Sequence, residues 1–266
     1  MLKLRIMTFL LVLFLLLPST VVFGQASSSS IDKTNLSNGL ISTNYKLKKD
    51  VETKIMISKG DITYTYDLKS NNSFPLQLGD GEYTVSILEN VAGNKYRLVE
   101  KEDITLKSID GNKVFLQSIQ IVNWNQHMDS VKRAKELTKN AKDDKEKVTK
   151  IYNYIINNIK YDSHKAENVK TDYIPSIDET LKTSQGICYD YAALFAAMLR
   201  SVDVPTKLVM GRKNDVKAYH AWNQVYLKDT NEWVTIDTTY DAAIAKNNRS
   251  NLMIKDEKEY MIEKQY

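Results

Sequence analysis

Cysteine is almost absent from this chain of 266 residues: Cys188 is the only one. A single cysteine cannot form a disulfide within the chain, so a disulfide framework is excluded. No group of cysteines and histidines has zinc-ligand spacing, and no acidic loop has calcium-ligand spacing. We therefore predict no metal and no cofactor.

An excess of charge of one sign is also missing. The formal net charge is +4, and Lys3 and Arg5 near the N-terminus supply two of these charges. The other charged residues are a mixture of lysines and acidic residues, which is typical of an ordinary solvated surface. We predict no nucleic-acid partner.

Long apolar runs are missing except at the N-terminus. Residues 6–17 are apolar, follow two basic residues, and are followed by a proline and small residues. This run is short for a membrane span and typical of a signal peptide, which we assign to 1–24. Cleavage after Gly24 or Ala26 fits the pattern, and a retained N-terminal anchor is the alternative. We expect a secreted or cell-surface protein with no integral membrane span after cleavage.

Composition and periodicity divide the rest of the chain. Residues 25–45 are rich in serine and asparagine and are predicted to be a linker. Over 46–122 the apolar residues alternate, as in Ile62, Tyr64 and Tyr66, and turn signals separate the short runs. This pattern predicts a small β-rich, sandwich-like domain. It contains no cysteine or histidine, and we find no chemical site in it.

The period becomes helical in the second half, which we assign to one domain over 123–266. Helices are predicted from Asp129 or Ser130 to Asn140, from Asp144 to Ile159, and from Cys188 to about Val202. Strands are predicted at 207–210, 219–227 and 232–238. Helices followed by strands indicate an α+β fold.

Cys188 falls in the first turn of a predicted helix, after a non-helical segment at Ser184 and Gly186. Free backbone N–H groups and the positive end of the helix dipole stabilise a thiolate there. The same N–H groups can hold a developing oxyanion. A reactive thiol is one interpretation of this lone cysteine. An intermolecular disulfide and a small buried apolar residue are the others.

A nucleophilic thiol needs a base, and His220 is the candidate. His127 and His164 lie in polar segments and are interpreted as surface residues, whereas His220 begins an apolar strand. Asp237 follows the next apolar strand, where a buried carboxylate needs a partner.

The hairpin between the two strands decides whether these side chains meet. With a loop of two residues, Lys228-Asp229, His220 and Asp237 face each other directly. With a loop of four residues, 228–231, they are diagonal neighbours on one face. Either register allows a triad in which Cys188 attacks, His220 moves the proton and Asp237 orients the imidazole. A His–Asp pair that only stabilises the sheet is the alternative.

Several spaced segments resemble the transglutaminase-like superfamily. They are Gly186-Ile187-Cys188-Tyr189-Asp190-Tyr191-Ala192, Leu199-Arg200 with Val204-Pro205, Gly211, His220-Ala221-Trp222 and Trp233-Val234-Thr235-Ile236-Asp237-Thr238-Thr239-Tyr240. The resemblance covers about 145–245. It implies a papain-like core, with helices packed on an antiparallel sheet, and a thiol acyl-enzyme mechanism.

The resemblance leaves the second substrate open. The well-studied animal transglutaminases have Gln-Cys-Trp around the nucleophile, whereas this chain has Ile187-Cys188-Tyr189, so neither cross-linking nor calcium dependence follows. Gln185 is a weaker candidate for an oxyanion donor, with helix capping as its alternative role. Tyr189 and Trp222 are weaker candidates for lining the acyl groove, with core packing as theirs.

We therefore predict a secreted thiol enzyme that acts on amide bonds, by hydrolysis or by acyl transfer to an amine. Its expected partner is a protein or peptide substrate, with cell-wall and extracellular material as candidates. The alternative is a non-catalytic cell-surface binding or structural module on the same core.

Overall fold

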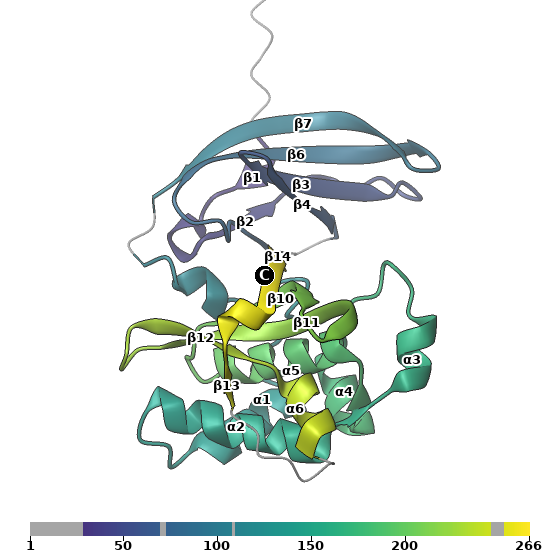
Figure 1. Cartoon of the computed structure of the whole chain (residues 1–266). Helices are drawn as coiled ribbons and strands as arrows, with labels where there is room; N and C mark the ends of the chain where they lie inside the picture. Colours follow the sequence, from purple (N-terminus) through teal and green to yellow (C-terminus); the bar gives the residue numbers. More distant parts are fainter. Residues whose placement is uncertain (1–28, 70–72, 108–109, 246–252) are drawn as a thin grey trace, which may run out of the picture.

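The computed structural model describes residues 29–69, 73–107, 110–245 and 253–266. The predicted signal peptide therefore lies outside the described residues. Within the described ranges, no helix is long and apolar enough to cross a membrane. Figure 1 shows a β region formed by the N-terminal half above a mixed α/β half.

The β region contains two antiparallel sheets. Its elements are β1 (Ile31–Asp32), η1 (Leu36–Asn38), β2 (Leu40–Thr43), β3 (Thr53–Lys59), β4 (Ile62–Asp67), β5 (Phe74–Pro75), β6 (Gly81–Ala92) and β7 (Lys95–Leu106). The strand orders are β1-β2-β5 and β4-β3-β6-β7. Alternating residues of both sheets share one apolar core, which includes Ile41, Ile55, Tyr66 and Phe74. This is the sandwich-like arrangement that the alternating pattern predicts.

The predicted linker over 25–45 is wrong in its described part. Strands β1 and β2 lie there, and Ile31 and Ile41 are buried in the core of the β region. The segment is rich in serine and asparagine and has few apolar residues, so its composition does not indicate strands. These apolar residues suffice for short strands because β1 pairs with β2 and β2 pairs with β5. Ile41, for example, pairs with Phe74 of β5.

The second half has the predicted α+β layout. Its elements are η2 (Lys113–Leu116), α1 (Asp129–Thr138), α2 (Asp144–Asn158), β8 (Lys160–Tyr161), α3 (Ser163–Asn168), α4 (Ile177–Thr183), β9 (Gln185–Gly186), α5 (Cys188–Arg200), β10 (Thr206–Lys213), β11 (Val216–Leu227), β12 (Glu232–Ile236), α6 (Thr238–Ala245), β13 (Ile254–Lys255), η3 (Glu257–Glu259) and β14 (Tyr260–Gln265). The five-stranded antiparallel sheet has the order β13-β12-β11-β10-β14. In Figure 1 it lies between the β region and helices α1 and α2.

Helix α5 is the centre of this half. Residues Tyr191 to Leu199 are all fully or almost fully buried, so the helix is apolar all round and is covered on every side. It contacts β10 and β11 on one side and α1, α2 and α4 on others. Asn223 of β11 bonds the helix to the sheet, since the side-chain amide donates to the carbonyl of Ala192 over 2.9 Å.

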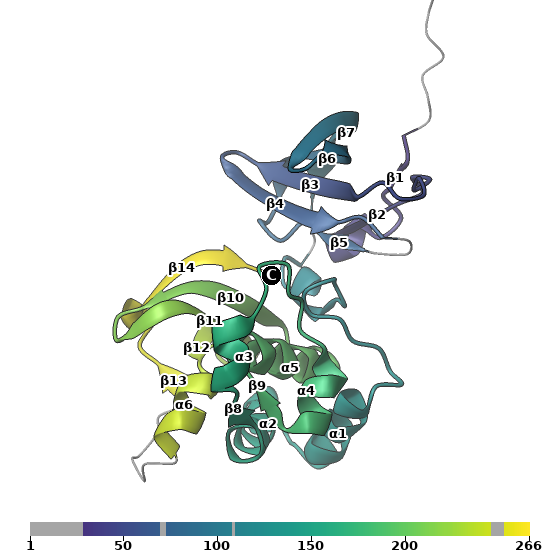
Figure 2. The same cartoon turned by 90° about the vertical axis from the view of Figure 1, so that its right-hand side faces the viewer.

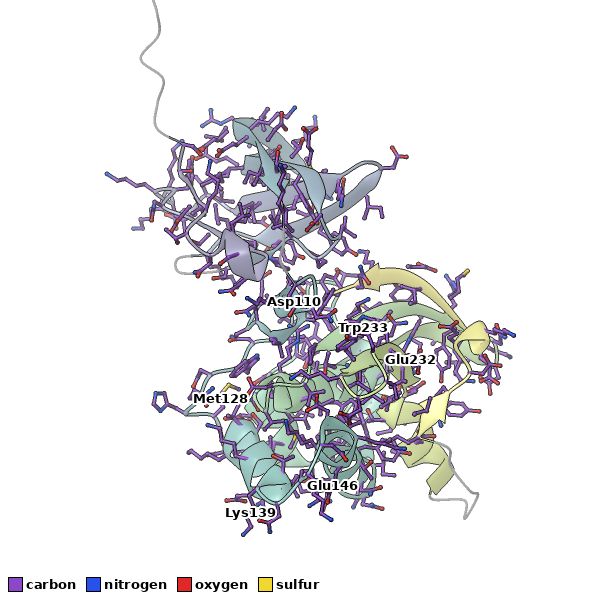
Figure 3. All side chains as sticks on the ribbon, turned by 90° about the vertical axis from the view of Figure 1, so that its left-hand side faces the viewer. Asp110, Met128, Lys139, Glu146, Glu232 and Trp233 are labelled. Carbon is purple, nitrogen blue, oxygen red and sulfur yellow. The ribbon has the colours of Figure 1, made fainter. Side chains whose placement is uncertain are left out.

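Several contacts hold the two halves together. The ring of Tyr266 lies edge-on to Tyr64 of β4, with centroids 5.3 Å apart, and the Gln265 N–H donates to the Tyr64 hydroxyl over 3.1 Å. Within the second half, Trp233 packs edge-on against Phe115 of η2, near the point where the chain leaves the β region (Figure 3). The boundary between 122 and 123 stays a prediction.

Arg200 adds a buried clamp at the same junction. Its guanidinium is 1% exposed and donates to the backbone oxygens of Thr206, Gln117 and Tyr266. Burial lowers the pKa of this group to about 9. One side chain at the end of α5 thereby bonds to the start of β10, to the segment after η2 and to the residue after β14.

β14 approaches β10 closely at Gly211. A Cβ on Gly211 would lie 2.0 Å from the carbonyl oxygen of Met261. We expect Gly211→Ala to lower the free energy of unfolding by about 1–3 kcal/mol, because β14 must move away. Urea unfolding measures the loss, and Gly111→Ala is the control since that Cβ would meet nothing within 4 Å. Equal losses in the two variants would contradict the prediction.

Candidate active site

Cys188 is the first residue of α5, as the sequence predicts. Ser184 ends α4 in the left-handed conformation, with φ 53°, and Ile187 is extended before the helix starts. Two backbone bonds from β8 hold this approach, from Lys160 N–H to Ser184 O and from Asp162 N–H to Gly186 O. Cys188 is partly exposed.

The carboxylate of Asp190 fixes the start of α5. Asp190 is fully buried, and its Oδ2 accepts from the Ile187 N–H over 2.8 Å and from Lys165 Nζ over 2.7 Å. The Tyr173 hydroxyl donates to its other oxygen. Gly186 leaves room for the carboxylate, because a Cβ there would lie 2.6 Å from the Asp190 Cβ.

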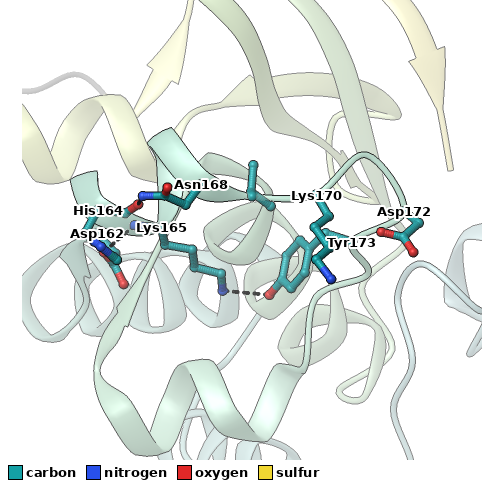
Figure 4. A pocket seen from close by; sticks show the side chains of 8 residues that line it. Asp162, His164, Lys165, Asn168, Lys170, Asp172 and Tyr173 are labelled. Carbon is teal, nitrogen blue, oxygen red and sulfur yellow. Dashed lines mark hydrogen bonds between the residues drawn. The ribbon is translucent and has the colours of Figure 1, made fainter.

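The partners of Asp190 come from the polar segment before the helix, in which the sequence analysis predicts no site residue. Figure 4 shows Lys165 reaching toward the Tyr173 hydroxyl across a pocket of about 400 Å³. The pocket is formed by the segment from Asp162 to Tyr173. Tyr173 also stands edge-on to Tyr189, with ring centroids 6.2 Å apart.

The hairpin of β11 and β12 has the four-residue loop, since Leu227 pairs with Glu232 and Asn223 with Ile236. His220 and Asp237 are therefore diagonal neighbours, the second of the two predicted registers. His220 Nε2 lies 2.7 Å from Asp237 Oδ2, and both side chains are buried.

His220 also lies within hydrogen-bonding range of Cys188, so the structure brings all three predicted residues together. Because Nε2 faces Asp237, Nδ1 is the ring nitrogen left for the thiol. Burial opposes protonation of the imidazole, but the bonds to Asp237 and Cys188 outweigh it and raise the pKa of His220 to about 10. The geometry therefore favours an imidazolium beside the thiol at neutral pH.

Asp237 is held by more groups than the sequence predicts. Its Oδ1 accepts from the Tyr240 N–H over 3.0 Å, because Asp237 caps helix α6. The strand predicted to reach residue 238 therefore ends at Ile236. Its Oδ2 also accepts from the Tyr260 hydroxyl over 3.2 Å. Tyr260 comes from β14, a strand that the sequence pattern does not predict.

The three weaker site candidates, Trp222, Tyr189 and Gln185, lie in different surroundings in the structure. Trp222 is buried and packs against Tyr260. Its ring stacks on the imidazole of His220, with centroids 6.0 Å apart, and so helps to hold that imidazole in place. Its Nε1 has no hydrogen-bond partner among the described residues. Tyr189 is partly exposed and lines a groove. Gln185 is exposed on β9, where its backbone pairs with Lys160.

Known proteins can now be compared with this geometry. Residues 131–238 match the sequence profile of the transglutaminase-like superfamily. This segment belongs to that superfamily. The match spans the segment that carries Cys188, His220 and Asp237.

Two other likenesses concern parts of longer proteins. The UPF0252 protein MJ1282 of Methanocaldococcus jannaschii is 33% identical over 107 residues, covering 36% of this chain and only 30% of that protein. Red sea bream transglutaminase is 13% identical, with a TM-score of 0.32, over 75% of this chain and 47% of that chain.

A third likeness is to a candidate cysteine protease of Cytophaga hutchinsonii. It is 18% identical, with a TM-score of 0.41, over 71% of this chain and 73% of that chain.

Proposed function

We propose that this protein is a thiol enzyme that cleaves amide bonds through an acyl-enzyme on Cys188. The observation that supports this most directly is the arrangement of three side chains: a partly exposed thiol at a helix start, an imidazole beside it, and a buried carboxylate 2.7 Å from that imidazole. Nucleophile, base and orienting group stand in the order that such chemistry requires.

In the first half-reaction the Cys188 thiolate attacks the carbonyl carbon and forms a C–S bond. His220 gives its proton to the departing nitrogen as the C–N bond breaks, so an amine or ammonia leaves. The N–H groups in the first turn of α5 stabilise the oxyanion. Asp237, held by Tyr240 and Tyr260, keeps the imidazole oriented throughout.

In the second half-reaction water or an amine attacks the thioester. His220 takes a proton from the attacking group, a C–O or C–N bond forms, and the C–S bond breaks to restore the thiolate. Water gives a carboxylic acid and an amine gives a new amide. We propose a protein or peptide as the acyl donor, because Tyr189, the residue after Cys188, lines a groove of about 380 Å³.

The test uses a mixture of denatured proteome peptides with cadaverine as the amine. Mass spectrometry would follow three changes: new peptide ends, conversion of glutamine to glutamate, and addition of cadaverine. We expect at least one change in the presence of the wild-type protein and none with Cys188→Ala. A wild-type protein that changes no peptide would refute the proposal and leave a non-catalytic module on this core.

Export is a further part of the proposal, and it rests on the sequence of residues 1–24 alone. A version of the protein tagged at its C-terminus would be expressed in a host with a signal peptidase. We expect the tag outside the cytoplasm and a new N-terminus after Gly24 or Ala26. An intact N-terminus on a cytoplasmic product would contradict export.

A further inference from the structure

A groove of about 380 Å³ runs between the β region and the second half of the chain. Its walls include Thr65 and Asp67 of β4 on one side, and Met210 and Tyr189 on the other. Tyr189 directly follows Cys188 at the start of α5, so the groove and the thiol share this helix start. In Figure 2, β4 lies on the side of the β region that faces β10 and β14.

Strand β4 is an edge of its sheet, because its only neighbour there is β3. In the β3–β4 hairpin, residues 62, 64 and 66 point their backbone N–H and C=O groups toward β3, since the register closes at the pair Lys59 and Ile62. The bond from the Leu68 N–H to Thr53 O continues this alternation. The backbone groups of Thr63, Thr65 and Asp67 therefore point outward.

One of these outward residues already binds an amide. The Asp67 N–H donates to Gln120 Oε1 over 3.3 Å, and Gln120 Nε2 donates to Asp67 O over 2.9 Å. This is the bonding pattern that a residue of a neighbouring strand would supply. The next outward residue, Thr65, is exposed, and no group in the described part of the chain bonds to its backbone.

The charges around the groove are balanced. Lys54 Nζ is bonded to Asp67 and Glu52, each over 2.6 Å, and the remaining charged side chains of the walls are one acid and one base, Asp172 and Lys264. The groove therefore favours neither an anion nor a cation. A neutral polar group that donates and accepts in alternation matches the free edge better, and an extended peptide backbone is such a group.

We propose that the acyl part of a peptide substrate binds in this groove as an added strand on β4, with its backbone bonded to Thr65. The inference rests on the proposed thiol chemistry and assigns it a substrate class. We place the acyl part here because it stays attached to Cys188 through both half-reactions, whereas the leaving amine departs after the first. The β region then acts as half of the substrate site.

The test compares three reagents that alkylate Cys188: iodoacetamide, acetyl-alanyl chloromethyl ketone, and the same ketone with four alanines. In the wild-type protein the four-residue ketone should react at least about tenfold faster than the one-residue ketone, as expected for two added backbone hydrogen bonds. In Thr65→Pro this advantage should disappear, while the iodoacetamide rate stays unchanged. Proline removes the outward N–H without breaking a bond to β3, so the hairpin should persist.

Thr105→Pro is the matched control. Thr105 lies on β7, the opposite edge of the same sheet, is exposed, and also has an outward N–H. It should keep the full tenfold advantage. The inference is overturned if the wild-type rates do not depend on probe length, or if Thr65→Pro keeps the advantage.

Sedimentation tests whether a second copy of the chain occupies the edge of β4, and labelling with iodoacetamide tests whether Cys188 reacts at all. A wild-type dimer that Thr65→Pro, but not Thr105→Pro, dissociates would show that a second copy occupies the edge, and it too would overturn the inference. A wild-type Cys188 that iodoacetamide does not label near neutral pH would instead refute the proposed thiol chemistry, and the inference would fall with it.

Discussion

At pH 6.5, Cys188 should react with iodoacetamide about a hundred times faster in the wild-type protein than in His220→Ala. The imidazolium of His220 stays protonated up to a pH of about 10 and favours the thiolate beside it. Without the imidazole, only about 1% of an ordinary thiol with a pKa of roughly 8.5 is ionised at pH 6.5. The rate, followed by intact-protein mass spectrometry, should be nearly level from pH 6 to 9 in the wild type.

The direction of the pH dependence of alkylation follows from the protonation of His220 and Cys188. Below a pH of about 10 the imidazole of His220 keeps its proton, so its positive charge lies beside Cys188 across the neutral range. In His220→Ala the rate should fall about tenfold for each pH unit below roughly 8.5, and it should approach the wild-type rate at pH 9. Superimposable profiles would show that no ion pair forms.

Two further variants give the comparison its controls. His127→Ala removes an exposed histidine and should keep the wild-type profile. Asp237→Asn keeps a side chain of the same shape at 2.7 Å from Nε2 but removes the charge that helps to raise the pKa of His220. Its profile should lie between those of the wild type and His220→Ala.

Local pattern predicts the parts of the site that lie on single elements. Before and after Cys188 the apolar residues recur at offsets of three and four, and this spacing predicts α2 and α5. The alternation around His220 predicts β11. The choice of hairpin register could be narrowed only to two possibilities, since both loop lengths keep His220 and Asp237 on one face.

The groups that hold the site come from distant parts of the chain, and local pattern does not report them. Tyr260 reaches Asp237 only because β14 pairs with β10, and that pairing depends on the close approach at Gly211. Lys165 reaches Asp190 from a short helix in a polar segment. Such contacts join residues with no shared periodicity. The signals present in the sequence were a glycine before the helix and an acid in its first turn.

The network at Asp190 gives the other large expected effect. Asp190→Ala would remove the acceptor of three groups at once: the Ile187 N–H, the Tyr173 hydroxyl and the Lys165 ammonium. Removing one partner of a buried ion pair typically costs about 3–5 kcal/mol, because the other charge stays without a partner. Lys165 is 30% exposed and keeps some water contact, so we expect about 3 kcal/mol, measured by urea unfolding.

Two further variants, Asp129→Ala and the double variant Asp190→Ala with Lys165→Met, test which interactions account for the loss of unfolding free energy in Asp190→Ala. Asp129→Ala removes an acid from the first turn of α1, where the side chain is 76% exposed and paired with Lys132, and it should cost less than about 1 kcal/mol. Adding Lys165→Met to Asp190→Ala should recover part of the loss, because it removes the unpaired charge. A cost at Asp190 no larger than that at Asp129 would mean that the bonds of Asp190 do not hold the start of α5. Since Cys188 is the first residue of that helix, the same variant should also slow alkylation at pH 6.5 by displacing the thiol from His220.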